Sequence, residues 1–510
     1  MGSVKNKKNI LATNLDKISL LTRMINRIRK NVMSKVLLIY PELYRSPFVS
    51  SSVVAVLKKQ FELFPPLGIL YIGRSLLDAG YEVEAIDFNS TSYNEAILLR
   101  LLSEKDAVGI TTNSFNLRGV DRLISDIRKA KPHIRIVIGG PDVTLHPRVI
   151  EGSDLSIAGE AEKTAPAIFD ALLNDGDFSK LNGAIYKMPL SKRTVYGKAP
   201  YIEHNLDSIK LPARELLTAK EKSQGYNLFG EKYKNRIATM ITTRGCPFRC
   251  RFCACNAISF KKYRKRSVQS CLEEIDQIHK EGYVILGIVD DNFLSIANRK
   301  LMIGIFNGII ERGYKFSIVA EGRVDSALDE QLYALMRRAG VVAVIYGMES
   351  MNQDVLDFYR KGTTVELNRK ATQLTYKYGI FSFAYFIIGT PFEDETLIKK
   401  MLKDMYSLRL DMVNIGGLLY SYGAPLWYEA KEKGLIDASE YAVPAGNEYN
   451  LSPLSSSQLS SLSYRALLAF YVRPIYWIRF FQKAMKFDKR ALYFIFRILQ
   501  KVFFYLFQLR

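Results

Sequence analysis

The sequence predicts an α/β protein in which a doubly wound parallel sheet precedes a partial barrel and a helical C-terminal region. Two series of short apolar strands alternate with helices, and a polar, irregular stretch at about 190–236 separates the two series. The strands are apolar on both faces, which is typical of parallel strands that helices cover on each side. A chain of 510 residues is too long for one hydrophobic core, so we expect more than one domain.

The first series runs from the strand VLLIYP to the strand LSIAGE. We expect strands at 36–41, 81–88, 107–112, 134–140 and 155–160, and helices at 65–80, 92–103, 117–130 and 163–174. Doubly wound sheets bind their ligands at the carboxyl ends of the strands. Those ends fall at 41–48, 111–115, 139–142 and 159–160, where we expect a ligand site.

The second series has six strand–helix steps, which indicates a partial (β/α)6 barrel. We expect strands at 237–243, 284–293, 316–325, 342–350, 381–391 and 412–423, and helices at 267–281, 298–312, 329–339, 365–378 and 393–408. Barrel enzymes place their chemistry at the carboxyl ends of the strands and in the loops that follow. A cysteine-rich stretch comes directly after the first of these strands, which is such a place.

The formal net charge of +21 is concentrated at the two ends of the chain. Residues 1–35 hold nine Lys or Arg against one acid, and residues 461–510 hold ten against one. A nucleic-acid enzyme more often carries its charge along its working groove, so we expect no nucleic-acid partner. Basic ends rich in Leu, Ile and Phe fit an anionic membrane surface better, although basic tails can also serve solubility alone.

Two apolar, aromatic and basic stretches, 464–487 and 491–509, make up most of the C-terminal region. Neither has 20 uninterrupted apolar residues, so a helix that crosses a membrane is not favoured. We expect helices that lie in the membrane interface with Trp477 and neighbouring aromatic residues inserted. The alternative is that both helices pack over the barrel.

Four of the five cysteines, Cys246, Cys250, Cys253 and Cys255, fall within ten residues. Cysteines so crowded cannot link distant parts of a large fold by disulfides, and no secretory signal is visible. We therefore expect a cofactor site in a reducing compartment, the cytoplasm. A zinc site lacks its second pair of ligands here, and a thioredoxin-like pair leaves Cys246 unexplained. An iron–sulfur cluster on three thiolates leaves one iron open for chemistry.

The stretch TTRGCPFRCRFCA resembles the cluster-binding loop of the radical S-adenosylmethionine (SAM) enzymes, whose signature is Cys-x3-Cys-x2-Cys. The resemblance implies that Cys246, Cys250 and Cys253 hold a [4Fe–4S] cluster and that SAM chelates its open iron. Reductive cleavage of SAM then releases a 5′-deoxyadenosyl radical. Phe252 stands where the family usually has an aromatic residue beside the adenine, and the pattern does not use Cys255.

The resemblance also implies SAM contacts at the ends of the later strands. Many family members have a Gly-Gly-Glu turn that this chain lacks, and its Asp-Asp-x-Phe form resembles the branch that carries a cobalamin domain. The candidate SAM-binding residues, beside Phe252, are Asp290, Asp291, Glu321, Arg323, Glu349, Gly389 and Pro391.

The first domain resembles the cobalamin-binding, Rossmann-like domain found ahead of the barrel in one large subfamily. The stretches PPLGILYIGRSLLDAGYEVEAIDF, VIGGPDVTLHP and IAGEAE carry this resemblance. No histidine stands in an Asp-x-His-x-x-Gly motif, so cobalt would lack a lower histidine ligand, or the domain has lost cobalamin. The candidate cobalamin-binding residues are Thr112, Asn113, Gly139, Gly140, Pro141, Gly159 and Glu160.

Together these resemblances imply a cobalamin-dependent radical SAM C-methyltransferase that acts on a hydrophobic, lipid or isoprenoid-like substrate. A reductant such as ferredoxin or flavodoxin would supply the electron. A ring-forming cyclase of the same architecture and a non-catalytic iron–sulfur redox protein remain alternatives. The expected organisation is a basic segment at 1–34, the cobalamin-binding-like domain at 35–190, a linker at 191–236, the radical SAM domain at 237–435 and the helical region at 436–510.

Overall fold

The computed structural model of the chain describes residues 33–42, 65–113, 116–188, 191, 193–218, 236–489 and 492. Some of the expectations therefore fall outside the described residues. They concern nearly all of the basic segment 1–34, residues 43–48 and 114–115 of the expected ligand edge, residues 219–235 of the linker, and the apolar stretch 491–509 apart from Leu492.

The first sheet has seven strands in the order β2-β1-β3-β4-β5-β6-β7. Its first five strands pair in parallel and form the doubly wound sheet that the sequence predicted. These strands are β1 (Lys35–Tyr40), β2 (Glu82–Asp87), β3 (Ala107–Thr111), β4 (Arg135–Gly139) and β5 (Leu155–Ile157).

Helices cover both faces of this sheet. Successive side chains of a strand point to opposite faces, so each strand contributes apolar side chains to a core on either side. In β1, Leu38 belongs to a core cluster that includes Leu70 and Phe169, whereas Leu37 belongs to a second cluster that includes Leu98. The helices are α3 (Leu67–Asp78), α4 (Glu95–Leu102), α5 (Leu117–Ala130), α6 (Pro141–Leu145) and α7 (Ala165–Leu173).

Two antiparallel strands, β6 (Ala184–Lys187) and β7 (Thr194–Tyr196), complete the first sheet. Strand β7 lies within the stretch predicted as a linker, so the sheet continues past residue 190. The sequence did not reveal this edge because β7 has only three residues, which are partly or largely exposed and follow no buried pattern. Further along the same stretch, the buried Arg214 pairs with Glu274 and donates to the carbonyl of Thr239 at 2.6 Å.

The second sheet has six parallel strands in the order β15-β14-β13-β12-β11-β8. Within the described part of the chain, its edge strands β15 and β8 do not pair with each other, so the barrel is partial, as predicted. The strands are β8 (Ile237–Met240), β11 (Ile285–Ile288), β12 (Ser317–Gly322), β13 (Val341–Glu349), β14 (Phe381–Ile388) and β15 (Met412–Gly417).

Capping side chains and glycines mark the ends of the helices between these strands. Asp329 caps α11 by accepting the amide of Leu332, and Gly340 ends the helix with a left-handed φ of 98°. The five predicted helices are observed as α9 (Val268–Lys280), α10 (Arg299–Glu311), α11 (Glu330–Ala339), α13 (Val365–Lys377) and α14 (Glu395–Tyr406); the short α12 (Gln353–Phe358) was not predicted.

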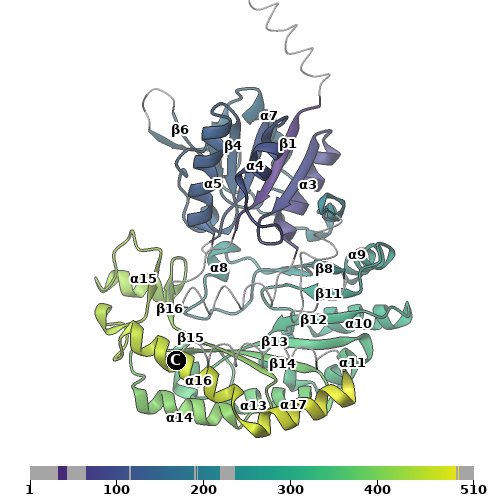
Figure 1. Cartoon of the computed structure of the whole chain (residues 1–510), viewed down its shortest axis with the longest axis vertical. Coiled ribbons are helices and arrows are strands. Elements are labelled where there is room, and N and C mark those ends of the chain that lie inside the picture. Colours follow the sequence, from purple (N-terminus) through teal and green to yellow (C-terminus); the bar gives the residue numbers. More distant parts are fainter. Residues whose placement is uncertain are drawn as a thin grey trace, which may run out of the picture.

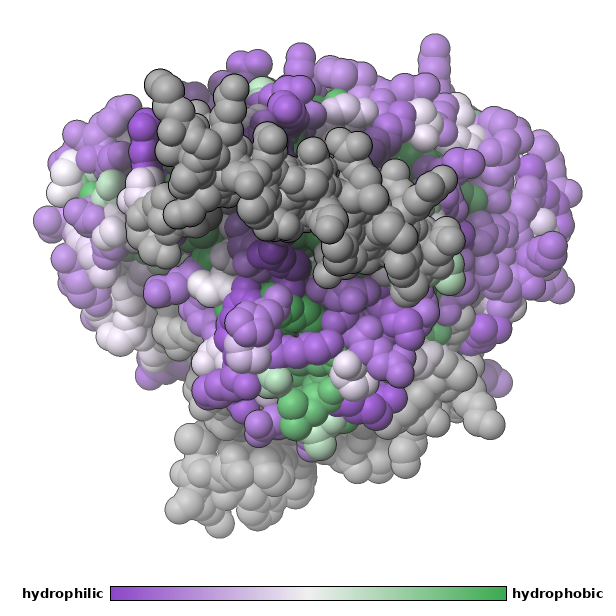
Figure 2. All heavy atoms as spheres, turned by 90° about the horizontal axis from the view of Figure 1, so that it is seen from above, coloured by the Kyte–Doolittle hydropathy of each residue, from purple (hydrophilic) through white to green (hydrophobic). Residues whose placement is uncertain are grey.

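The carboxyl edge of the first sheet faces the barrel across a seam that short elements line (Figure 1). Helix α8 (Cys255–Ile258) lies between the two sheets and contacts α6. The strand pair β9 (Thr243–Arg244) and β10 (Arg264–Lys265) borders the same seam. Seen from above the first sheet, the described surface is mainly hydrophilic, with hydrophobic side chains mostly in one area near its centre (Figure 2).

The C-terminal region adds the strand pair β16 (Leu419–Ser421) and β17 (Ala442–Pro444) and the helices α15 (Pro425–Glu432), α16 (Ser456–Tyr471) and α17 (Pro474–Phe487). Pro474 separates α16 from α17 because proline has no amide hydrogen and restricts the residue before it. The inner faces of both helices pack on the barrel, where Phe470 and Tyr476 are buried. In the described residues, no helix is long and apolar enough to cross a membrane.

Candidate functional site

The cysteine-rich loop starts at the end of β8, and Asp290 holds that strand end in place. Its carboxylate accepts the amide of Thr242 (2.6 Å), the hydroxyl of Thr242 (2.5 Å) and the hydroxyl of Thr243 (2.8 Å). Burial raises the pKa of Asp290 to about 6, against the opposing effect of these hydrogen bonds. Because its oxygens are engaged by the protein, Asp290 is suited to position the loop.

All five cysteines are free, and four of them lie in this loop or directly after it. Cys250 is buried, whereas Cys246 and Cys253 are half-buried. Burial raises the pKa of the Cys246 thiol above its ordinary value and that of Cys253 to about 11. Such thiols become good ligands when a positive centre replaces their protons, as an iron–sulfur cluster does.

Cys255 occupies a different environment from the three cysteines of the motif. Burial raises the pKa of its thiol strongly, and the neighbouring carboxylate of Asp291 raises it further. Its backbone amide points at Cys253, at 3.4 Å from the Sγ atom. An amide directed at a sulfur atom is the kind of neighbour that tunes an iron–sulfur cluster.

The three thiols do not gather as ligands of a single ion do. Among the described residues, no group of three or more His, Cys, Asp or Glu side chains is close enough to share one metal ion. A mononuclear zinc site would draw its thiolates to about 2.3 Å from one atom. A four-iron cluster holds each thiolate on a separate iron.

Arg323, directly after β12, lies against the cysteine loop. Its Nη1 atom is 3.8 Å from Sγ of Cys250, and its guanidinium carbon is 3.6 Å from the ring centre of Phe248. It also donates to the carbonyl oxygen of Lys361. A buried guanidinium beside a thiol favours the thiolate form that a cluster requires.

Glu349 and Lys361 form a buried ion pair at 2.7 Å next to the loop. Glu349 has a left-handed φ of 63°, which is rare for a residue other than glycine and is typical of functional sites. The Lys361 ammonium lies 5.9 Å from the ring centre of Phe252, and that ring packs edge-on against Tyr359 at 5.0 Å. Two charges and two aromatic rings thus converge beside the last motif cysteine.

Several buried polar atoms near these residues have no hydrogen-bond partner in the described protein. Both amide atoms of Asn292, the hydroxyl of Tyr359 and the hydroxyl of Thr390 are in this state. Asn292 follows Asp291, whose carboxylate accepts the amide of Gly245 at 3.2 Å. An unpaired buried polar group costs about 1–3 kcal/mol, so these atoms fit a site that a polar ligand completes.

The predicted residues on the other barrel strands have varied surroundings. Gly389 has a left-handed φ of 103°, and a Cβ atom there would meet Leu459 of α16 at 2.8 Å. Glu393 accepts the amides of Gly389 (3.0 Å) and Thr390 (2.9 Å), and Pro391 is exposed. Glu321 is half-buried, and its carbonyl pairs with the amide of Leu294. The structure thus supplies a packing reason for Gly389.

At the first sheet, the turn after β4 packs closely against the end of β3. Gly140 has a left-handed φ of 109°, and a Cβ atom there would meet the backbone oxygen of Thr112 at 2.5 Å. Pro141 begins α6 directly after this turn, and Gly139 has space for a Cβ atom. Asn113 donates to the hydroxyl of Tyr40 at 3.4 Å. These residues share the carboxyl edge of β3 and β4, as predicted.

Glu160 connects the first sheet to the barrel. Its carboxylate accepts two hydrogen bonds from Arg264, each 2.8 Å long, and lies 3.1 Å from Arg244. Burial would raise its pKa, but these arginines outweigh burial and hold the pKa below its ordinary value. Gly159, just before it, is closely approached by the backbone of Tyr201. Glu160 is therefore suited to hold the two sheets together.

Aromatic residues of the C-terminal region close the same seam. The rings of Tyr422 and Tyr441 are nearly parallel, and the ring of His146 lies 5.0 and 5.6 Å from them. Burial and the nearby Arg148 lower the pKa of His146. Arg148 also pairs with the fully buried Asp142 at 2.8 Å.

Sequence reasoning placed Asn292 at a strand end without listing it as a ligand, and it missed Lys361, Phe248 and the pair Arg244 and Arg264. A basic residue before Gly362, in RKGTT, is a weak signal for Lys361, and Asn292 stands in the DDNF stretch beside Asp290 and Asp291. The contacts of Arg244 and Arg264 with Glu160 have no signal in the sequence, because Glu160 is 84 residues or more away from both.

The fold and the site define a class: an α/β enzyme with a thiol-bearing barrel loop at the edge of a second parallel sheet. Two family models match the chain, the B12 binding domain over residues 53–169 and the Radical SAM superfamily over residues 240–405. A domain of the B12-binding family therefore precedes a domain of the radical SAM superfamily in this chain. The cofactors of these two families are a [4Fe–4S] cluster with SAM, and cobalamin.

Three curated relatives cover most of the two domains. An uncharacterized methyltransferase of Pyrococcus horikoshii is 28% identical over 80% of this chain and 88% of its own length. The anaerobic magnesium-protoporphyrin IX monomethyl ester cyclase of Synechocystis is 28% identical over 65% of this chain and 66% of its own length. The hopanoid C-3 methylase of Methylococcus capsulatus is 26% identical over 63% of this chain and 60% of its own length.

Two solved structures share the fold. The radical SAM methyltransferase TsrM from Kitasatospora setae, with cobalamin and a [4Fe–4S] cluster bound, has a TM-score of 0.62 at 18% identity over 79% of this chain and 75% of its own. OxsB, a cobalamin-dependent SAM radical enzyme with aqua-cobalamin and SAM bound, has a TM-score of 0.65 at 16% identity over 86% of this chain and 67% of its own.

Proposed function

We propose that this enzyme is a cobalamin-dependent radical SAM methyltransferase that adds a methyl group to a carbon atom of a hydrophobic substrate. The observation that carries the proposal is the seam, where the carboxyl edge of the first sheet meets the cysteine loop. Leu145 of α6 lies over Gly423, which is also packed against Ala254 and Ala257 beside the cysteines. One substrate in this seam could therefore reach cofactors held on both sides.

When bound, the cluster and SAM supply an electron and a hydrogen-abstracting radical, and cobalamin supplies a methyl carrier. We assign Cys246, Cys250 and Cys253 to the cluster. Arg323 lies next to Cys250, and its charge lowers the pKa of Cys246 against the larger, opposing effect of burial. The three motif thiols leave the fourth coordination position to SAM.

We assign the recognition of SAM to the polar groups around Phe252. The amide of Asn292 offers both a donor and an acceptor that the protein leaves unpaired among its described residues. Glu349 and Lys361 offer opposite charges that match an amino group and a carboxylate. The ring of Phe252 offers an apolar face for a base, and Asp291 is exposed next to the loop.

We assign the backbone around Thr112, Gly139 and Gly140 to cobalamin. The left-handed turn at Gly140 keeps the edge of β3 and β4 free of a side chain at that point. Glu160 keeps this edge oriented toward the barrel through Arg264. In this proposal Glu160 acts on cobalamin only indirectly.

A hydrophobic substrate fits both the relatives and the seam. One relative is named as a methylase of hopanoids, and others as cyclases of a porphyrin ester. The seam itself presents aromatic and small apolar groups, among them Tyr422, Tyr441 and Ala257. We further propose a cytoplasmic location and a ferredoxin- or flavodoxin-type reductant, which the free cysteines support.

The test uses anaerobically purified, reconstituted holoenzyme with reductant, cobalamin and SAM labelled on its methyl carbon. We expect 5′-deoxyadenosine, S-adenosylhomocysteine and label that enters a total lipid extract supplied as substrate. Label that stays wholly in the water-soluble fraction would show that the substrate class is wrong. If neither 5′-deoxyadenosine nor S-adenosylhomocysteine forms, the enzyme proposal fails and the iron–sulfur redox alternative is favoured.

A ring-forming cyclase is the second candidate, because cyclases of a porphyrin ester match two thirds of the chain. The same assay separates the two functions. A cyclase would release 5′-deoxyadenosine without stoichiometric S-adenosylhomocysteine, whereas methyl transfer yields both.

A further inference from the structure

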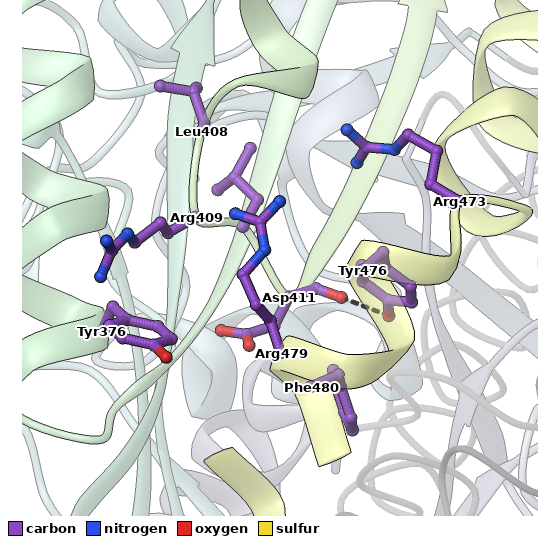
Figure 3. A pocket seen from close by; sticks show the side chains of 9 residues that line it. Tyr376, Leu408, Arg409, Asp411, Arg473, Tyr476, Arg479 and Phe480 are labelled. Atoms are coloured by element: carbon purple, nitrogen blue, oxygen red, sulfur yellow. Dashed lines mark hydrogen bonds between the residues drawn. The ribbon is translucent and has the colours of Figure 1, made fainter. Parts of the chain in front are cut away.

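A recess lies at the opposite end of the barrel from the seam. The loop between α14 and β15 meets α17 there, beside the end of α13 (Figure 3). The recess is shallow: its enclosed volume is about 10 Å³, and the roughly 310 Å³ around it includes open solvent. Its lining residues are Tyr376, Leu408, Arg409, Leu410, Asp411, Arg473, Tyr476, Arg479 and Phe480.

Three arginines surround this recess, and its lining contains a single acid. That acid, Asp411, already accepts Lys483 at 2.6 Å and the amide of Ser382 at 2.8 Å. Among the described residues, no carboxylate lies within ion-pair distance of Arg409, Arg473 or Arg479. The recess therefore holds uncompensated positive charge.

The three guanidinium groups have few partners within the described part of the chain. Arg409 contacts the ring of Tyr376, at 4.6 Å, and Arg479 donates to a carbonyl of its own helix at 3.3 Å. Arg473 donates to the carbonyls of Tyr406 (2.6 Å) and Phe470 (3.1 Å). Most of their N–H groups remain available, and a phosphate group matches the fork of donors that each arginine presents.

An apolar stripe on α17 runs beside the recess. We define it as Val472, just before the helix, and Ile475, Ile478, Phe481 and Met485 on it, which are 55%, 51%, 53%, 53% and 44% exposed. The spacing of three or four residues puts the stripe on one side of the helix. Its buried side holds Tyr476, Phe480 and Ala484 instead. A row of large apolar side chains in solvent marks a contact surface.

The apolar stripe and the arginines of the recess lie side by side and form one surface. Arg479 lies on α17 between Ile478 and the recess, and the exposed Lys486 continues the basic side of the helix. Apolar residues with arginine and lysine along their flank are the pattern of a helix that lies in a membrane interface. In Figure 1, α17 lies at the end of the molecule away from the first sheet, so contact there leaves the seam uncovered.

We propose that α17 docks on an anionic phospholipid membrane, with a lipid phosphate at the mouth of the arginine recess and the apolar stripe in the acyl region. Anchoring leaves the catalytic seam free to take a substrate from another side. This inference is independent of the proposed methyl transfer, because the surface lies far from the cysteine loop and shares no residue with it.

The test is flotation of the full-length holoenzyme with vesicles of phosphatidylcholine alone or with about 30% phosphatidylglycerol. We expect flotation only with the anionic vesicles. Each basic residue at such a surface strengthens binding roughly fivefold, so the double variant Arg409→Gln/Arg479→Gln should bind about 30-fold more weakly. Replacing Ile478 and Phe481 by Ser should also weaken binding, while cluster iron and formation of 5′-deoxyadenosine stay unchanged.

The matched control is the variant Leu99→Ser/Arg100→Gln on α4. Leu99 is 48% exposed and Arg100 is exposed, so the control removes the same kinds of side chain from the first domain. It should float like the unaltered protein. Equal loss in the control and the α17 variants, or unchanged flotation of the α17 variants, would overturn the proposal.

The same series of experiments tests two other occupants of this surface. Calorimetry with inorganic phosphate tests a free anion: binding of phosphate without flotation on anionic vesicles would replace the membrane by a soluble ligand. Light scattering of the holoenzyme tests a second copy. If the stripe variants turn a dimer into a monomer and leave flotation intact, the stripe is a subunit interface and the membrane proposal is wrong.

Discussion

The two carboxyl edges that meet at the seam differ in how they are equipped for a ligand. The barrel edge presents side chains, and several of its buried polar atoms, including those of Asn292, lack a partner among the described residues. At the first edge Glu160 is paired with Arg264 and Asp142 with Arg148, and the half-buried backbone of Gly140 packs closely against Thr112. The barrel edge is therefore suited to recognise its ligand by side chains, and the edge of the first sheet by the shape of its backbone.

The largest expected effect concerns the barrel edge. Cys250→Ala should abolish binding of the cluster, because three thiolates are the fewest that can hold it with one iron open. Cys255→Ala should leave most of the iron in place, since that thiol is outside the motif. Iron and sulfide analysis of both proteins checks this expectation, and equal losses would refute the three-ligand assignment.

A tenfold effect is expected for Asn292→Ala. The affinity for SAM should fall about tenfold, because a buried hydrogen bond to a ligand is worth about 1–2 kcal/mol. The thermal midpoint should hardly change, since the amide atoms of Asn292 have no partner in the described protein. Equilibrium dialysis with SAM measures the affinity.

Asn298 provides the matched control for this variant. Its amide donates to the carbonyls of Asn292 (2.7 Å) and Phe293 (3.1 Å), so Asn298→Ala should lower stability instead. A stable Asn292→Ala protein with normal SAM affinity would break the idea that the barrel edge reads its ligand through side chains.

A smaller, several-fold effect is expected at the first edge. Gly140→Ala should weaken retention of cobalamin several-fold, because alanine is strained at a φ of 109° and its Cβ would meet Thr112. Gly139→Ala is the control, since the nearest atom to its Cβ is 3.6 Å away. Absorbance of cobalamin after gel filtration measures retention, and cluster iron should stay equal in both. Greater loss in Gly139→Ala would contradict the shape argument.

The smallest expected effect is the pH dependence of the connection between the edges. The pKa of Glu160 is held below its ordinary value, and hydrogen bonds from Lys163 and Tyr201, against the effect of burial, lower the pKa of Glu203 to about 2. Lowered carboxyl pKa values stabilise the fold fully above about pH 4.5, and this stabilisation is lost as the pH falls toward about 2.

We therefore expect the thermal midpoint of the cofactor-free protein to fall on acidification from about pH 5 to about pH 3. In Arg264→Met the fall should be smaller by roughly 3 °C, because Glu160 then has a more ordinary pKa. Differential scanning calorimetry at each pH measures both proteins. Parallel curves for the two proteins would show that Glu160 does not connect the edges electrostatically.

Much of the fold is predictable from local patterns in the chain. Apolar runs such as ILGI in β11 are buried in full, and the strands and helices of both predicted series are observed within a few residues of their predicted bounds. The three-residue β7 was missed, as was the break before Pro474 within the stretch 464–487. A short edge strand has too few residues to show a period, whereas a proline is a local signal for such a break.

The candidate site divides in a similar way. The cysteine loop is a local motif, so its place after β8 was predictable from spacing alone. Lys361 next to Phe252 and Arg323 next to Cys250 are pairs from separate strands or loops, at distances that no local pattern reveals. The packing of Gly389 on Leu459 likewise depends on a helix 70 residues later.

The sequence by itself determined the order of strands and helices, the thiol-bearing loop and the basic, apolar character of the C-terminal helices. These properties depend on residues that are close together in the chain, where periodicity and spacing are visible. Only the tertiary structure decided that Glu160 holds the barrel rather than a ligand, that Asn292 is buried without a partner among the described residues, and that three arginines share a recess on α17. The physical reason is that charge pairing and burial are decided by neighbours in space, which the fold brings together from distant parts of the chain.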